Sequence, residues 1–384
     1  MKSSCHTNKN FKTNSTKKLQ KDMKHLFVVH SGITCIVAKQ FIKESNISFD
    51  DCLFITRRNI KLPESIINYT KNIINYPQDI LKKGDNRIFV NNNPISGLKN
   101  IKLLEDKINL FFCGHRFSLY LPETASCDLM SVLVTMKTCS EYYLFEEGLG
   151  QYIKRENLKT KRIMGMNPFF FKILRFLFPR FYKLRDEHYS ISSHKYVGHI
   201  AISEDAFPEY QGKKILINCP FEKISIKFKA DVILSIDAGI LHYIDYKNTK
   251  ILYNKLAKIF NEKGYKKIAY KFHPNYYENM NVINKYRILL KDAFGQNIEE
   301  IEPNIFLENY IITCNADFYS DRSSVGFYVS KYGIKNYSYY NLIKGISMDY
   351  DELLKPGMEL FKKCSIMLEN TSNHKNNMHE YCDN

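Results

Sequence analysis

The sequence lacks the features that mark membrane-spanning, exported and disulfide-stapled proteins. Its 384 residues contain no apolar run of the roughly 18 residues that a transmembrane helix needs. The polar stretch 1–24 lacks the apolar core of a signal peptide. The ten cysteines stand singly, without CxxC pairs, so together with the missing signal they indicate reduced thiols in a cytosol.

Gly-rich phosphate loops of the Walker or GxGxxG kind are absent, which argues against nucleoside triphosphatases and dehydrogenases. The only DxD pattern is Asp349-Tyr350-Asp351, at the start of the last predicted helix, where acids are expected for capping and helix-dipole reasons. We therefore predict a structural role for it and no metal site. Hydrophobic residues make up 44% of the chain, enough for the cores of two ordinary domains.

The net charge of +16 is concentrated in two places rather than spread over the chain. Residues 1–24 carry +6 and residues 153–185 carry +9. An even coat of basic residues would suggest nucleic acid as the partner. Two local basic segments indicate docking instead.

Strand-like and helix-like segments alternate along the chain. In the first half the strand-like runs are 25–30, 51–57, 107–114 and 142–147, and a helix is predicted over 128–137. In the second half strands are predicted at 213–218, 230–236, 266–272 and 316–320, and helices at 249–264, around Glu308, at 323–333 and at 350–370. This alternation is typical of α/β domains with parallel sheets.

The predicted organisation has two α/β domains with a hinge between about 200 and 230. The ranges are a basic disordered tail (1–24), an N-terminal Rossmann-like domain on the acceptor side (25–210), a C-terminal Rossmann-like domain that binds a nucleotide sugar (211–370), and a polar tail (371–384).

Polar side chains follow several of these strands, and ligands of open α/β sheets bind at the carboxyl ends of strands. In "YYLFEEGLGQYI" two acids, Glu146 and Glu147, end an apolar run on a glycine turn. For an acid pair alone, a solvated strand end is the simpler explanation. In "KFHPN" the pair His273-Pro274 ends a second run, where a structural turn is the alternative.

A serine pair lies late in the chain. Ser323 and Ser324, in "DRSSVGFY", begin a predicted helix, where hydroxyls and free N–H groups can bind phosphate or simply cap the helix. Between the histidine and the serines lies "EPNIFLENY", which begins at Glu302.

Taken together and in this order, these elements resemble the bacterial sialyltransferases of GT-B type, most closely the capsule polysialyltransferases. Those families share an acidic-acidic-Gly motif, a His-Pro motif and a late Ser-Ser pair. The resemblance spans roughly residues 25–335, and its residue matches are concentrated in "EEGLGQY", "KFHP", "EPNIFLENY" and "DRSSVGFY".

The resemblance implies a GT-B fold, two Rossmann-like domains facing each other across a cleft, and inverting transfer from CMP-sialic acid. A sugar hydroxyl needs a carboxylate to take its proton, and Glu146, the first acid of the motif, is the predicted base. His273 would assist the leaving CMP phosphate as general acid. Ser323 and Ser324 would hold the phosphate, with Pro274 beside the nucleotide and Glu302 on the ribose hydroxyls. No cofactor or metal is expected.

The segment 167–185, "NPFFFKILRFLFPRFYKLR", mixes aromatic and basic residues without any acid. It fits either a buried helix with a basic rim or an interfacial segment on anionic lipid. The second interpretation suits a cytoplasmic enzyme, peripheral at the inner face of the bacterial inner membrane, whose glycan acceptor is lipid-linked.

Three alternatives remain open from the sequence. The donor could be another CMP-sugar such as CMP-Kdo, because nothing in the motifs identifies the sugar. The product could be a singly sialylated lipooligosaccharide or a capsule polymer. The chain could instead be a basic nucleic-acid-binding protein, although the acid, histidine and serine motifs would then have no role.

Overall fold

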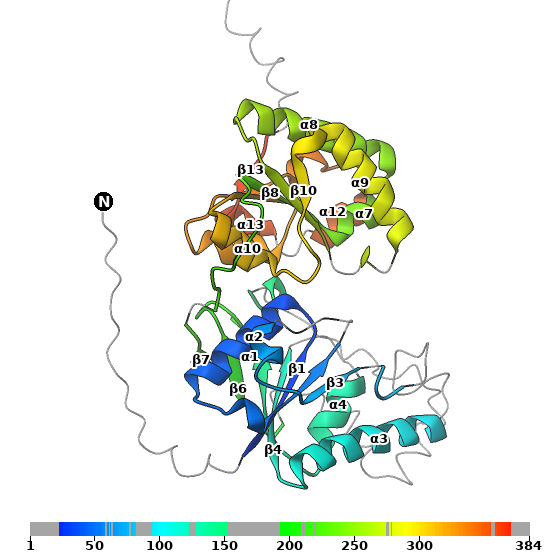
Figure 1. Cartoon of the computed structure of the whole chain (residues 1–384), viewed down its shortest axis with the longest axis vertical. Helices are drawn as coiled ribbons and strands as arrows, with labels where there is room; N and C mark the ends of the chain where they lie inside the picture. The colour runs from blue at the N-terminus through cyan, green and yellow to red at the C-terminus, as the bar shows by residue number, and fades with distance from the viewer. Residues whose placement is uncertain are drawn as a thin grey trace, which may run out of the picture.

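The computed structural model describes residues 23–57, 60, 62, 64–76, 78–81, 94–122, 128–152, 193–208, 210, 212–218, 220–273, 276–277, 279–354 and 358–369. They form two α/β domains, each built on one sheet (Figure 1). The first sheet has seven strands in the order β3-β2-β1-β4-β5-β6-β7 and the second has six in the order β10-β9-β8-β11-β12-β13. Every strand pair in both sheets is parallel.

The first domain covers both faces of its sheet. Its strands are β1 (Lys24–Val29), β2 (Cys52–Thr56), β3 (Ile73–Asn75), β4 (Phe117–Pro122), β5 (Cys139–Phe145), β6 (Tyr196–Ala201) and β7 (Lys213–Leu216), and its helices are α1 (Gly32–Glu44), α2 (Glu64–Ile67), α3 (Pro94–Phe112) and α4 (Asp128–Thr135). Leu26 and Val28 face the core beneath α3 and α4, whereas Phe27 and Val29 face the core beneath α1. This alternation explains why residues 26–29 of β1 are an unbroken apolar run.

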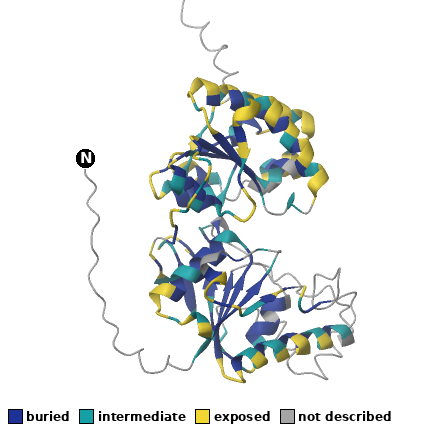
Figure 2. Cartoon of the chain, viewed as in Figure 1, coloured by how far each residue is buried: buried dark blue, intermediate teal, exposed yellow. Residues whose placement is uncertain are grey.

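The second domain repeats the same plan. Its strands are β8 (Val232–Ile236), β9 (Ile268–Phe272), β10 (Ile298–Glu300), β11 (Asp317–Ser320), β12 (Asn336–Ser338) and β13 (Ile366–Met367), and its helices are α7 (Ala238–Tyr243), α8 (Tyr246–Glu262), α9 (Met280–Phe294), α10 (Leu307–Cys314), α11 (Ser324–Ser330), α12 (Met348–Leu354) and α13 (Met358–Cys364). Its strands are buried between helices on both sides (Figure 2). Two Rossmann-like domains in series are the GT-B fold, as predicted.

The two domains pack against each other through α11 and the segment before α10. Phe327 and Tyr328 of α11 belong to the same core as α1 and β1. Phe306 lies over Gly32 at the start of α1, so closely that a Cβ there would come within 2.9 Å of the Phe306 ring. These contacts bring the carboxyl ends of strands from both sheets toward the domain interface.

Most predicted elements are confirmed, but two predictions were wrong. Most of the run 107–114 is the end of helix α3, which stops at Phe112, because the apolar residues Ile108 and Phe112 lie one helical turn apart and pack on the sheet. The strand there is β4, which begins at Phe117. The single helix predicted over 350–370 is α12, α13 and the short strand β13.

The predicted domain boundary at 210/211 falls before β7, which pairs with β6 in the first sheet. The second sheet begins at Val232, so the connection between the sheets follows Leu216. No helix among the described residues is long and apolar enough to cross a membrane.

Candidate functional site

Each sheet has one topological switch point, where the strand order reverses. In the first sheet it lies between β1 and β4, and in the second between β8 and β11. Open α/β sheets bind ligands at the carboxyl ends of the strands at these points. His30 directly follows β1, whereas Asp237 follows β8 and Asp321 follows β11. The site is therefore built from these residues and the predicted motifs.

Glu146, the first acid after β5, is fully buried and hydrogen-bonded through both carboxylate oxygens. Its Oε1 accepts the hydroxyl of Tyr152 and, at 2.8 Å, that of Tyr328 in α11. Its Oε2 accepts the backbone N–H of Ile202 at 2.7 Å. Burial raises the pKa of this carboxyl, and hydrogen bonds from these three donors oppose the rise. Glu146 therefore links the two domains.

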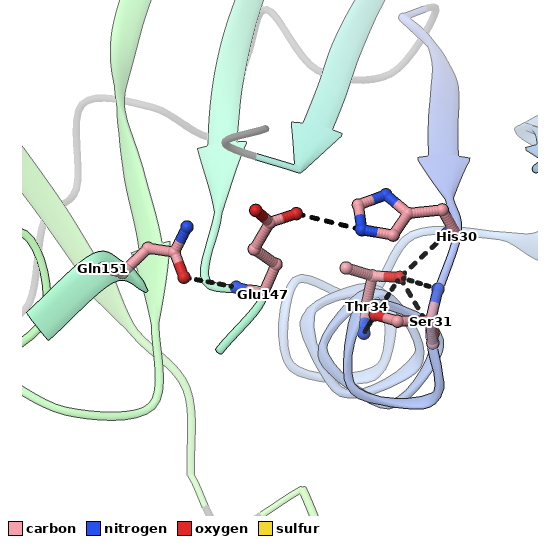
Figure 3. A network of polar contacts seen from close by, with 5 residues as sticks. All are labelled: His30, Ser31, Thr34, Glu147 and Gln151. Atoms are coloured by element: carbon pink, nitrogen blue, oxygen red, sulfur yellow. Dashed lines mark hydrogen bonds and ion pairs between the residues drawn. The ribbon is translucent and has the colours of Figure 1, made fainter. Parts of the chain in front are cut away.

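Glu147, the second acid, has different partners (Figure 3). Its Oε2 lies 3.0 Å from Nε2 of His30, and the side chain is 16% exposed against 3% for the histidine. Its backbone N–H donates to Oε1 of Gln151 at 3.3 Å. Glu147 is thus anchored at both ends of the residue while part of its side chain stays accessible.

The turn between β1 and α1 fixes the position of His30. Its backbone N–H donates to Oγ1 of Thr34 at 3.1 Å, and the N–H of Ser31 donates to the same oxygen at 3.1 Å (Figure 3). Ser31 is the N-cap of α1, and Ser31 and Thr34 satisfy each other's backbone N–H groups in a capping box. The sequence analysis missed His30, although its place directly after an apolar run was a usable signal.

Gly148 and Ser324 bring the acid motif and the serine motif together across the domain interface. A Cβ added to Gly148 would lie 3.5 Å from Cβ and 3.6 Å from Oγ of Ser324. Gly148 has φ +153, a conformation that other residues rarely adopt, so glycine suits the turn. Ser323 is the N-cap of α11, and its Oγ accepts the N–H of Val325 at 3.3 Å.

His273 and Glu302 follow the neighbouring strands β9 and β10. The backbone N–H of His273 donates to the carbonyl of Ile236 at 2.9 Å, and its side chain is half-buried. Glu302 is exposed. Lys271 holds the loop after Glu302, since its Nζ donates to the carbonyl of Pro303 at 3.3 Å. Burial lowers the pKa of Lys271 to about 8. Pro274 lies outside the described residues.

Asp237 and Asp321 form a carboxyl pair at the second switch point that the sequence analysis missed. Oδ1 of Asp237 accepts the hydroxyl of Ser235 at 2.9 Å, and its Oδ2 accepts the backbone N–H of Asp321 at 3.2 Å. Asp321 is buried, and burial followed by the charge of Asp237 raises its pKa well above the ordinary value. Each acid directly follows a strand, a signal that the sequence contains.

The DxD pattern lies in α12, where Tyr350 packs against Gly239 of α7. Asp351 accepts the hydroxyl of Tyr340 and the N–H of Gly345, each at 2.9 Å, so it ties down its own loop. Among the described residues, no three His, Cys, Asp or Glu side chains come together as a metal site. Metal independence stays a prediction.

Comparison with known proteins gives structural similarity alone. No protein-family model and no curated protein matches the sequence. The GT-B domain of a sialyltransferase from Photobacterium damselae is 13% identical, with a TM-score of 0.49 and coverage of 90% of this chain and 97% of that one. The UDP-GlcNAc 2-epimerase from Methanocaldococcus jannaschii is 13% identical, with a TM-score of 0.47 and coverage of 91% and 90%. One fold supports many chemistries, so function is argued from the site.

Proposed function

We propose that this protein is an inverting sialyltransferase that moves sialic acid from CMP-sialic acid to a sugar hydroxyl of a bacterial surface glycan, either capsule polysialic acid or lipooligosaccharide. The main support is the contact between Gly148 and Ser324. It joins two motifs that lie far apart in the sequence and belong to different domains, which is the arrangement that transfer between a donor and an acceptor requires.

The geometry favours Glu147, rather than the Glu146 chosen from the sequence, as the general base. Glu146 is fully buried with both oxygens occupied by donors, so an acceptor hydroxyl could reach it only after those bonds break. Glu147 is partly accessible and lies at the first switch point with His30. A base must come within hydrogen-bonding reach of the proton it takes.

In the proposed reaction Glu147 takes the proton of the acceptor hydroxyl. As it does so, the oxygen of that hydroxyl bonds to the anomeric carbon of sialic acid. The bond from that carbon to the CMP phosphate oxygen breaks with its electron pair, and His273 donates a proton or hydrogen bond to that oxygen. The hydroxyls of Ser323 and Ser324 bind the phosphate. By resemblance to the family, Glu302 would bind the ribose hydroxyls and Pro274 would contact the nucleotide.

The acceptor and the place of action follow from the basic segment 167–185, which lies outside the described residues, as do residues 1–22 and 370–384. Its composition supports a lipid-linked glycan acceptor and peripheral attachment at the inner face of the inner membrane. The amino-acid composition carries this part of the proposal alone.

The direct test is to incubate the purified protein with a sialylated oligosaccharide and, in parallel, CMP-sialic acid, CMP-Kdo or UDP-GlcNAc. We expect mass spectrometry to detect a product with added sialic acid only from CMP-sialic acid, and equal yield in EDTA. Transfer from CMP-Kdo would change the proposed donor sugar but leave the assignment of the site residues in place. Conversion of UDP-GlcNAc without any transfer, or RNA binding without CMP binding, would contradict the proposal.

A further inference from the structure

We propose that His30 is a positioning residue for the general base: it holds one oxygen of Glu147, so that the other oxygen faces the acceptor hydroxyl. The inference rests on the proposed function, in which Glu147 is the base. His30 itself does not touch the substrate and acts through the carboxylate.

The different roles of His30 and Glu147 follow from their contact and from how far each side chain is buried. Nε2 of His30 and Oε2 of Glu147 lie 3.0 Å apart, within ion-pairing distance. Oε2 is buried, and the histidine side chain is only 3% exposed. The other carboxylate oxygen points away from the ring (Figure 3). The Glu147 side chain is therefore the more exposed member of the pair, and the imidazole is the buried one.

The surrounding turn is built to keep the histidine in place. His30 follows the central strand β1, and the Ser31–Thr34 capping box fixes the turn on its carboxyl side. The backbone N–H of Glu147 donates to the side chain of Gln151, which fixes the backbone at this residue. A carboxylate on a glycine turn would otherwise sample several rotamers, and a shift of about 1 Å in a catalytic group can cost on the order of 10²-fold in rate.

The first experiment measures kcat and both KM values for His30→Leu and His30→Gln. We expect His30→Leu to lower kcat by about 10²-fold, with both KM values within twofold of wild type, because donor and acceptor contacts remain. We expect His30→Gln, which keeps an N–H donor at a similar reach, to recover at least tenfold of that loss. Equal kcat values in wild type and His30→Leu would overturn the inference.

A matched control lies at the other end of the same strand. His25 is also buried, with its Nδ1 3.0 Å from the hydroxyl of Tyr120. His25→Leu should reduce thermal stability about as much as His30→Leu, without a selective loss of kcat. If His25→Leu lowers kcat as strongly as His30→Leu, loss of packing explains both results and the positioning role fails.

The double variant His30→Leu with Glu147→Gln separates this inference from the proposed function. If His30 acts only through Glu147, the double variant should be no slower than Glu147→Gln alone. Slow turnover in Glu147→Gln with normal turnover in His30→Leu would overturn the positioning role alone. Normal turnover in Glu147→Gln would overturn the base assignment itself.

Should His30→Leu not fold, His30→Asn and His30→Gln replace it. Both keep an amide donor, but the shorter Asn side chain cannot reach the position of Nε2. We expect kcat of His30→Gln to exceed that of His30→Asn by about tenfold or more, an effect of reach within the limit set by misplacing a catalytic group. Equal values would overturn the inference.

Discussion

The two switch points differ in the charges that they bring together. At the first, the carboxylate of Glu147 faces an imidazole, which can carry a positive charge. At the second, Asp237 and Asp321 are two carboxyls, and burial with like charge keeps the pKa of Asp321 high. A carboxyl that keeps its proton does not repel an incoming phosphate. The first switch point, with its partly accessible acid, thus suits proton removal, and the second suits anion binding.

The largest effect is expected from the acid at the first switch point. Glu147→Gln keeps the shape and removes the basic oxygen, so turnover should fall by about 10²-fold or more, as is typical of general-base loss. CMP binding, measured by calorimetry, should barely change, because the base meets the acceptor.

Glu146→Gln is the companion variant to this first test. Its carboxamide keeps one acceptor oxygen but cannot satisfy all three donors of the buried carboxylate, so we expect a loss of thermal stability that exceeds the loss of turnover. The reverse pattern, with Glu146→Gln inactive but stable and Glu147→Gln active, would return the base to the first acid of the motif.

The second switch point is tested through its serines. Ser324→Ala should weaken CMP binding by roughly 10- to 10²-fold, the range for a lost hydrogen bond to a charged group of about 1.5–3 kcal/mol. Ser330→Ala, at the far end of the same helix, removes a hydroxyl that donates to the carbonyl of Phe327 and should leave CMP affinity unchanged. Equal affinity in all three proteins would remove Ser324 from the donor site.

Periodicity and motif order predicted much of this arrangement. The apolar runs identified β1, β2, β5, β8, β9 and β11 because strands covered on both faces are rich in apolar residues. Gly264 lies just past the end of α8 with φ +75, as a glycine that ends a helix commonly does. The amphipathic end of α3 was mistaken for a strand, since a short apolar run has no periodicity of its own.

The partners of the site residues could not be predicted in the same way. Which of two adjacent acids is buried depends on contacts with Tyr328, which lies 182 residues further along the chain. The pairing of Asp237 with Asp321 depends on the order of strands in the second sheet, where β8 and β11 are neighbours although two strands separate them in sequence. Tertiary contacts of this kind leave no local pattern.

The contact between the two domains through Glu146 is tested by Tyr328→Phe. This variant removes one donor from the buried carboxylate of Glu146, so unfolding free energy should fall by about 1–3 kcal/mol. Tyr339→Phe is matched in burial, but its hydroxyl donates to the neutral carbonyl of Ser235, and the expected loss is about 0.5–1.5 kcal/mol. Denaturant unfolding measures both. Equal losses would show that the charge of Glu146 adds nothing to the domain contact.

The smallest expected effect concerns the carboxyl pair, and it depends on pH. Burial and the charge of Asp237 raise the pKa of Asp321 well above its ordinary value, so the folded state binds this proton more tightly than the unfolded state. The wild type should therefore lose stability as pH rises from about 4 toward the raised pKa. In that range folding must either keep the proton on Asp321 or bury its charged carboxylate.

Asp321→Asn cannot titrate, and its amide can still donate to Asp237. We expect its melting temperature to exceed that of wild type at pH 8 and the difference to shrink toward pH 5. Asp237→Asn removes the like charge but leaves burial, so it should flatten the pH dependence only in part. Parallel melting curves for all three proteins from pH 5 to 8 would contradict a protonated pair, and with it the contrast between the two switch points.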